Sequence, residues 1–234
     1  LQSVLAKKSD PAPKLADLVP PQFDTPVYVI GDVHGRMDLL HLLLGQLDAQ
    51  IPVILVGDYI DRGDNSARVL EFLANRPHLL CLMGNHEQML LEFLDDPVAN
   101  WRMWSRNGGL QTLLSYGVRP PANRSDSMDM MRVAHDLRKK MGQTTIDWLR
   151  NLPHFLHVNN VVVVHAGLDP TAPVSEQNQH TMLWGHHDFL TSQRTDQQWV
   201  VHGHTIVDQP EIHPGRIAID TGAYASGVLT AALF

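Results

Sequence analysis

The chain has 234 residues, 44% of them hydrophobic, and a formal net charge of −7 at pH 7. This length predicts one large domain or at most two small ones, and the apolar content excludes wholesale disorder. The negative charge argues against indiscriminate binding to nucleic acid or to a membrane surface, and no apolar run approaches the roughly 20 residues of a membrane-spanning helix. A single cysteine, Cys81, forbids an internal disulfide and fits a reducing compartment, so we expect a cytoplasmic protein.

The first 25 residues are rich in proline and polar side chains, and they lack the apolar core and cleavage site of a secretory signal. We expect residues 1–25 to form a surface arm and residues 26–234 to form a single domain. From Pro26 onward, short apolar runs alternate with amphipathic stretches. The expected order is a strand at 26–31, a helix from Met37 to Leu47, a strand at 51–57, a helix capped by Asn65 or Ser66 and stopped by Pro77, a strand at 78–84, and a helix from His86 to Leu94. This alternation predicts a parallel sheet with right-handed crossovers.

Residues 98–155 have a different pattern, with three tryptophans, an Asn-Gly-Gly break and no strand signal, and they predict a helical insertion. Short β-type runs then return, joined by Gly/Pro turns, at 160–167, 197–204, 216–220 and 227–233. They predict a second sheet packed on the first, and the fold class is therefore α/β.

Fourteen histidines are present, and many of them stand beside Asp, Asn or Gly where a strand is expected to end. Each of five expected apolar strands is followed by a loop that contains glycine together with Asp, His or Asn; the loops are 31–35, 57–63, 84–87, 165–167 and 202–205. Ligands bind at the carboxyl ends of strands in open α/β sheets because loops from different strands converge there. The sequence therefore predicts metal or acid–base chemistry at this edge.

The first two loops have the composition of a metal site. Asp32 and His34 lie two residues apart, so on an extended segment both side chains point the same way. One carboxylate oxygen with one imidazole nitrogen suits Mn²⁺, Fe²⁺ or Zn²⁺ better than Ca²⁺. Asp58, at the end of the next strand, could bridge to a second ion whose other ligands would be Asn85, His165 and His204. Two ions about 3.5–4 Å apart activate a water and stabilise an in-line displacement at phosphorus.

Each motif alone has an ordinary structural explanation. Asp-x-His is commonly a turn, Asp-Arg-Gly a surface turn with a local ion pair, and Asn-His-Glu a helix start with Asn as its cap. Chance does not account for all five motifs, each following an apolar strand.

The motifs GDVHG, GDYIDRG, GNHE, HAG and HGHT occur in this order over residues 26–233. They resemble the phosphoprotein phosphatase branch of the calcineurin-like metallophosphoesterases. The stretches 104–109 and 220–223 are most similar to bacterial and bacteriophage members of the lambda phosphatase type. The resemblance implies two mixed β-sheets packed as a sandwich and flanked by helices.

The resemblance also implies a role for each matching residue. Asp32 and His34 would bind the first metal and Asp58 would bridge, with Asn85, His165 and His204 on the second metal; Mn²⁺ is expected, with Fe or Zn as alternatives. His86 would be the general acid, held by Asp61, although it could instead be a metal ligand. Arg62 would grip the phosphate together with Asn85, and a metal-bridging hydroxide would attack directly.

One position departs from the family pattern. Many relatives carry a second phosphate-binding arginine just after a Leu-Trp pair, where this chain has Leu183-Trp184-Gly185-His186-His187. One of the two histidines could replace that arginine, Arg36 or Arg106 could reach in, or the pair could be an ordinary loop. Tyr224 is a further candidate for closing the site, and His202 for supporting it from behind.

We therefore expect a metal-dependent phosphomonoesterase, of the protein serine/threonine phosphatase type and also active on phosphotyrosine, with a phosphoprotein or a small phosphoester as its substrate. Glu87 favours this function. The alternative is a symmetrical diadenosine tetraphosphate hydrolase, because Trp101 and Trp104 could line an aromatic pocket for the dinucleotide. A non-catalytic metal-binding scaffold is a weaker alternative, because Asp61, Arg62 and His86 are all present.

Overall fold

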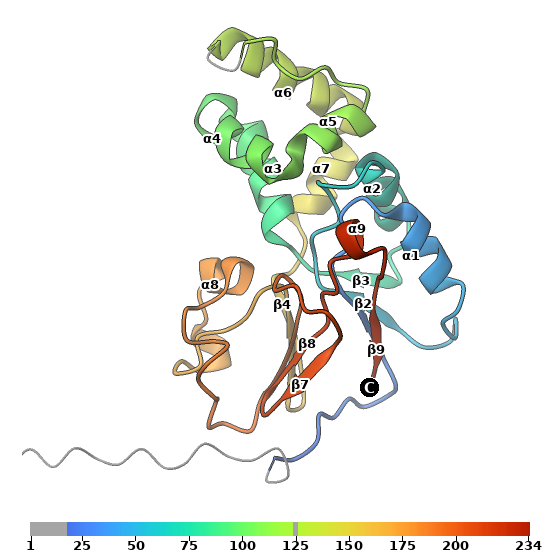
Figure 1. The fold of residues 1–234 in the computed structure, drawn as a ribbon, viewed down its shortest axis with the longest axis vertical. Helices are drawn as coiled ribbons and strands as arrows, with labels where there is room; N and C mark the ends of the chain where they lie inside the picture. Colours follow the sequence, from blue (N-terminus) through green and yellow to red (C-terminus); the bar gives the residue numbers. More distant parts are fainter. Residues whose placement is uncertain (1–17, 124–125) are drawn as a thin grey trace, which may run out of the picture.

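The computed structural model describes residues 18–123 and 126–234, and its two β-sheets pack face to face between helices (Figure 1). The first sheet has the order β3 (Leu79–Cys81), β2 (Val53–Leu55), β1 (Tyr28–Ile30) and β9 (Ala231–Leu233). The first three strands are parallel, as predicted. The run 227–233 was expected in the second sheet, which is wrong, because β9 pairs with β1 in the antiparallel sense. Helices α1 (Met37–Leu44) and α2 (Ser66–Ala74) connect the parallel strands. The sheet is therefore mixed, and its parallel strands end at one edge.

The second sheet is mixed as well. Its order is β4 (Phe155–Val158), β5 (Val161–Val164), β6 (Trp199–His202), β8 (Arg216–Ala218) and β7 (Glu211–His213). The three inner strands are parallel, and both outer strands pair in the antiparallel sense. The sequence analysis did not predict the two outer strands, and Phe155, the last residue of the expected insertion, opens β4. Both are hairpin partners with exposed or half-buried side chains, so neither has a continuous apolar run.

The inter-sheet core explains why the inner strands are apolar throughout. Val161 and Val163 pack against the first sheet, while Val162 and Val164 pack under α8 (Gln179–Trp184) with Met182. All four valines of β5 are buried because alternate side chains face the two layers. A separate core on the other face of the first sheet lies under α1, α2 and the helices that follow β3.

The chain between β3 and β4 is helical. It forms α3 (Asn85–Asp95), α4 (Pro97–Trp104), a π-turn (Ser105–Gly109), α5 (Leu110–Ser115), α6 (Ser127–Met141) and α7 (Gln143–Arg150). Figure 1 shows this helical segment at the top of the molecule, joined to the sheets through α3 and α7. Pro97 stands in the first turn of α4, and the Asp96 side chain accepts a hydrogen bond from the Ala99 N–H, which is why a new helix begins directly after α3.

Several local expectations need correction. Asn65 occupies the position before α2 but makes no side-chain cap, and Gly84, not Asn85, precedes α3. The short helices α8 and α9 (Ala223–Ser226) and the 3-10 turn Val174–Glu176 were not predicted.

No helix in residues 18–123 and 126–234 is long and apolar enough to cross a membrane.

The expected N-terminal arm is described only from residue 18, and residues 1–17 lie outside the described part. Leu18 is buried in the inter-sheet core, and the Val19 carbonyl accepts a 2.7 Å hydrogen bond from Trp199 Nε1. The Asn160 side chain accepts from the Gln22 N–H. The last part of the expected arm is therefore fixed along the second sheet.

Candidate functional site

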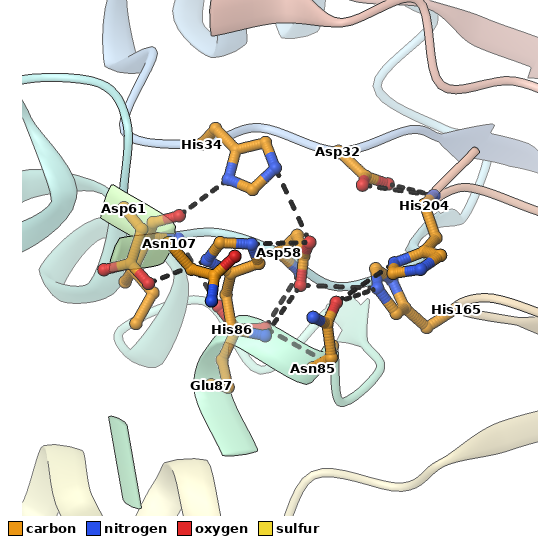
Figure 2. Close-up of polar contacts among 12 residues, drawn as sticks. Asp32, His34, Asp58, Asp61, Asn85, His86, Glu87, Asn107, His165 and His204 are labelled. Carbon is orange, nitrogen blue, oxygen red and sulfur yellow. Dashed lines mark hydrogen bonds and ion pairs between the residues drawn. The ribbon is translucent and has the colours of Figure 1, made fainter. Parts of the chain in front are cut away.

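The structure brings all five predicted loops together at the carboxyl ends of β1, β2, β3, β5 and β6 (Figure 2). Three of these strands belong to the first sheet and two to the second, so the site lies where the sandwich edges meet. Most of its polar side chains are almost fully buried; they include Asp32, His34, Asp58, Asp61, Asn85, His86 and His165.

Asp58 occupies the centre of this cluster. One group of potential ligand atoms comes from His34, Asp58 and His86, and a second from Asp58, His165 and His204, with the atoms of each group within 4.8 Å of one another. Asp58 Oδ2 lies 3.5 Å from His34 Nε2, and Oδ1 lies 3.4 Å from His165 Nε2. The two carboxylate oxygens thus face different imidazoles, an arrangement in which one side chain can serve two cations.

Asn85 completes the second group. Its Oδ1 lies 2.8 Å from His165 Nε2 and 3.1 Å from His204 Nδ1. Asn85 is the first residue of α3, and the next backbone N–H of that helix, from His86, donates to Asp58 Oδ1 at 3.0 Å. The start of α3 therefore fixes the amide and the central carboxylate together.

Asp32, predicted to share a cation with His34, belongs to neither group of ligand atoms and contacts the backbone of His204. Its carboxylate accepts a hydrogen bond from the His204 backbone N–H at 3.1 Å, and Gly203 has no room for a Cβ because that atom would overlap the same carboxylate. Burial, together with the nearby Asp220 and Asp58, holds the pKa of Asp32 well above its usual value. Several buried carboxylates at one place favour a bound cation.

The orientation of the imidazoles fits divalent metal ions. His34 Nδ1 lies 2.8 Å from the Ile60 carbonyl and His165 Nδ1 lies 3.2 Å from the Val56 carbonyl, which leaves each Nε2 aimed at Asp58. The buried His34 Nε2 has no hydrogen-bond partner among the described residues. A ring held by a backbone carbonyl, with its second nitrogen free, is the usual form of a metal-bound histidine. The donor set of carboxylate, amide and imidazole fits the divalent metals predicted from the sequence.

The pKa directions separate His86 from the other histidines. Burial lowers the pKa of His34 to about 3 and that of His165 to about 4, and it also lowers the pKa of His204, so these rings are neutral and able to bind a metal. Burial also disfavours the charged form of His86, but Asp58 and Asp61 outweigh it and raise its pKa. His86 Nδ1 lies 2.7 Å from Asp61 Oδ2, and its Nε2 lies 3.7 Å from Asp58 Oδ2.

The backbone at the site is held in an uncommon conformation. Five non-glycine residues of the site have positive φ angles between 44° and 68°: His34, Asp58, Asp61, Arg62 and His204. Such residues cost about 1–2 kcal/mol each and persist only where the surroundings fix them. No motif in the sequence predicted these positive φ angles.

Glu87 is a structural residue of the site that sequence reasoning did not identify as one. Its buried carboxylate accepts hydrogen bonds from the backbone N–H groups of Asp58 and Tyr59, both at 2.8 Å, and from Gly84. A Cβ at Gly84 would overlap Asp58, so glycine is required there. Glu87 thereby ties the loop after β2 to the start of α3.

Of the residues predicted to bind the substrate phosphate, Arg62 and Tyr224 lie beside His34, whereas Arg36 is paired with other residues. The Arg62 guanidinium lies 4.7 Å from the centre of the Tyr224 ring, which also packs edge-on against His34, and Arg62 has no carboxylate partner among the described residues. Arg36 is occupied elsewhere, by Asp38 and by the Ala223 carbonyl.

His186 and His187 lie in the turn after α8. Their rings are 4.2 Å apart, and neither has a contact with the Asp58 cluster in the described structure. His202 is buried against Phe189, facing the α8 side of its sheet.

Residues 25–208 match the family model for calcineurin-like phosphoesterases, so the chain belongs to that family. It is 30% identical over 222 residues to serine/threonine-protein phosphatase 2 of Escherichia coli K12, covering 87% of this chain and 90% of that protein. It is 24% identical to the asymmetrical bis(5'-nucleosyl)-tetraphosphatase of Oceanobacillus iheyensis, covering 88% and 87%. The crystal structure of a protein described as a candidate diadenosine tetraphosphatase has the same fold. It superposes with a TM-score of 0.64 at 21% sequence identity, over 92% of this chain and 91% of that chain.

The family and the histidine–aspartate cluster together define a metal-dependent phosphoesterase. The fold predicted from the sequence, two mixed sheets with flanking helices, is confirmed.

Proposed function

We propose that this protein is a phosphoprotein phosphatase that removes phosphate from serine and threonine, and also from tyrosine, at a centre of two divalent cations that share Asp58. Asp32 and His34 would hold one cation, and Asn85, His165 and His204 the other, with Mn²⁺ as the expected metal and Fe or Zn as alternatives. The observation that carries the proposal is the pair of ligand groups meeting at Asp58 beside a His86–Asp61 pair.

The residues of this chain supply binding and proton transfer. Arg62, free of any carboxylate partner among the described residues, would bind two phosphate oxygens side by side, and the Asn85 amide would bind phosphate as well. His86 would donate a proton from Nε2 to the leaving oxygen while Asp61 holds the ring through Nδ1. When bound, the cations would activate water and neutralise charge on the phosphate.

A protein substrate is favoured over a dinucleotide by the positions of two tryptophans. Trp101 and Trp104 would have suited an aromatic pocket for adenine, but they are only 3% and 0% exposed and pack against Phe93. Neither ring offers a free face to a base. The E. coli phosphatase relative is consistent with this choice.

Hydrolysis of dinucleoside tetraphosphates is the second candidate; the sequence analysis left the symmetrical reaction open, and the tetraphosphatase relative described above, of the asymmetrical kind, favours this substrate class. The test is a substrate panel with Mn²⁺-loaded protein: phosphoserine, phosphothreonine and phosphotyrosine peptides, p-nitrophenyl phosphate and diadenosine tetraphosphate. We expect phosphopeptides to have a higher kcat/KM than diadenosine tetraphosphate. A strong preference for the dinucleotide would overturn the proposal, and no turnover on any ester by the loaded protein would favour a binding scaffold.

A further inference from the structure

The Asp61 carboxylate is saturated with hydrogen bonds in a fully buried place. Trp104 Nε1 lies 3.1 Å from each of its oxygens, and Thr112 Oγ1 donates to Oδ1 at 2.6 Å. This leaves Oδ2 directed at His86 Nδ1, at 2.7 Å. Asp61, Trp104 and Thr112 each have 0% exposure. Water therefore has no access to this carboxylate, and its orientation is set by protein groups alone.

Both donors come from the helical segment, 43 and 51 residues along the chain from Asp61. Trp104 is the last residue of α4, and Thr112 lies in α5. Thr112 Oγ1 also accepts the Asp61 backbone N–H at 3.0 Å. The segment thus contacts both the side chain and the main chain of a residue whose own backbone is strained.

The turn between α4 and α5 is shaped for these contacts. A Cβ at Gly109 would overlap the Trp104 ring, so the glycine lets the indole lie flat against the turn. Gly108, at a φ of 105°, places its carbonyl to accept the Arg62 backbone N–H at 3.3 Å. The Trp-Ser-Arg-Asn-Gly-Gly stretch is therefore a clamp on Asp61 and Arg62.

We propose that Trp104 and Thr112 are positioning residues for proton transfer: they hold the Asp61 carboxylate in the orientation that fixes the His86 ring. This inference rests on the proposed function, because it assigns a role in the same reaction. It makes the helical segment part of the machinery for proton transfer.

A simpler account is that a buried carboxylate needs partners and that the two donors only stabilise the fold. The accounts differ in what they predict for different leaving groups. A structural role would lower turnover of all substrates alike. A positioning role would lower turnover most where the leaving oxygen needs a proton, and least for 2,4-dinitrophenyl phosphate, whose leaving group departs as an anion.

The test compares Thr112→Val, Thr112→Ser and Trp104→Phe in metal-loaded enzyme, with Trp101→Phe as the matched control. Trp101 lies in α4 like Trp104 and is also buried against Phe93 of α3, but it has no contact with Asp61 in the described structure. We expect Thr112→Val and Trp104→Phe to lose about 10- to 100-fold in kcat on a phosphoserine peptide and much less on 2,4-dinitrophenyl phosphate. Thr112→Ser should restore the kcat on the peptide, and Trp101→Phe should leave the ratio of the two rates unchanged.

Equal losses on both substrates, no recovery with serine, or the same change in the Trp101 control would overturn the inference. A second readout does not depend on turnover: in protein loaded with diamagnetic Zn²⁺, the His86 Nδ1 proton should give a downfield NMR signal that shifts or exchanges faster in Thr112→Val and Trp104→Phe. An unchanged signal in both variants would also overturn it. An inactive wild-type enzyme with the expected shifts in this signal would instead reject the proposed function alone.

Discussion

At the scale of single residues, the site is determined by where its carboxylates are buried. Asp58 is 1% exposed and surrounded by imidazoles, whereas Asp61 is surrounded by hydrogen-bond donors. The first environment suits shared cations, and the second suits a fixed partner for a proton donor. Two aspartates three residues apart thus have different chemistry because of the elements that pack around them.

The role of His86 can be tested with a single substitution. His86→Ala removes the proposed proton donor, so turnover of a phosphoserine peptide should fall by about 100-fold or more. Loss on p-nitrophenyl phosphate should be smaller, because nitrophenolate needs little protonation. Metal content, measured by plasma emission spectrometry, should stay at the wild-type level. Loss of one metal equivalent would show that His86 is a ligand, as the group formed with His34 and Asp58 allows.

Sequence reasoning predicted that the residues of the strand-end motifs lie together, because parallel strands bring them to one sheet edge, and the structure groups them there. It could not assign structural roles to Glu87, Trp104 or Thr112, whose partners lie 28, 43 and 51 residues away in the chain. A buried glutamate accepting backbone N–H groups has the same sequence signal as an ordinary first-turn glutamate. The placement of Arg36 against Asp38 also required the structure.

At the scale of elements, prediction succeeded for central strands and failed at edges. The run from 160 to 167 was visible because both faces of β5 are buried, whereas β4 and β7 alternate with solvent. The Asn159-Asn160 pair between the two β-type runs is the sequence signal that could have revealed β4, because Asn tolerates the positive φ of this hairpin turn, 52° at Asn159. Helix ends were less predictable, since the Asn65 position is set by its backbone bond to Gly35 and not by a side-chain cap.

The helical segment offers a prediction about pH and stability. Asp95, at the end of α3, pairs with Arg150 of α7 and Arg138 of α6, and the Arg150 hydrogen bond holds the pKa of Asp95 below its usual 3.8. These ion pairs stabilise the fold at pH values above the pKa that Asp95 has in the unfolded chain. Their contribution is lost as the pH falls through the lower pKa that Asp95 has in the folded protein. We expect Asp95→Asn to lower the free energy of unfolding by less than about 1 kcal/mol at pH 7, because the pair is exposed.

This prediction is checked by urea unfolding, which gives the free energy of unfolding of the wild type and of Asp95→Asn at pH 7 and at acid pH. The difference should shrink towards zero at the most acidic pH that the fold tolerates. Glu71→Gln, an exposed change on α2 without an ion pair in the described structure, is the control. A difference that grows on acidification would contradict the assignment.

At the scale of the whole molecule, the site exists only when the two sheets are packed. The first sheet supplies the loops with Asp32, Asp58 and Asn85, and the second those with His165 and His204. The inter-sheet core that joins them contains side chains of both sheets, among them Val29, Ile54, Val163 and Val201. Metal binding and sandwich packing should therefore be coupled, as they are when a preformed site is absent from the unfolded chain.

Cys81, which lies in the other core, under the helices that cover the first sheet, reports on whether the first sheet opens together with the rest of the fold. It lies on β3, the outer strand of the first sheet, is 6% exposed, and burial raises the pKa of its thiol to about 12. We expect negligible alkylation by iodoacetamide at pH 8 in native protein and rapid alkylation in denaturant. The free energy of opening from labelling rates should equal that of global unfolding, and a much smaller value would show that the edge strand opens by itself.

The central claim is that two cations share Asp58, and an anomalous difference map of crystals grown with Mn²⁺ tests it most directly. The account predicts two peaks, one on each side of the Asp58 carboxylate, the first beside His34 and the second beside Asn85, His165 and His204. One peak alone, or peaks that do not share Asp58, would contradict it.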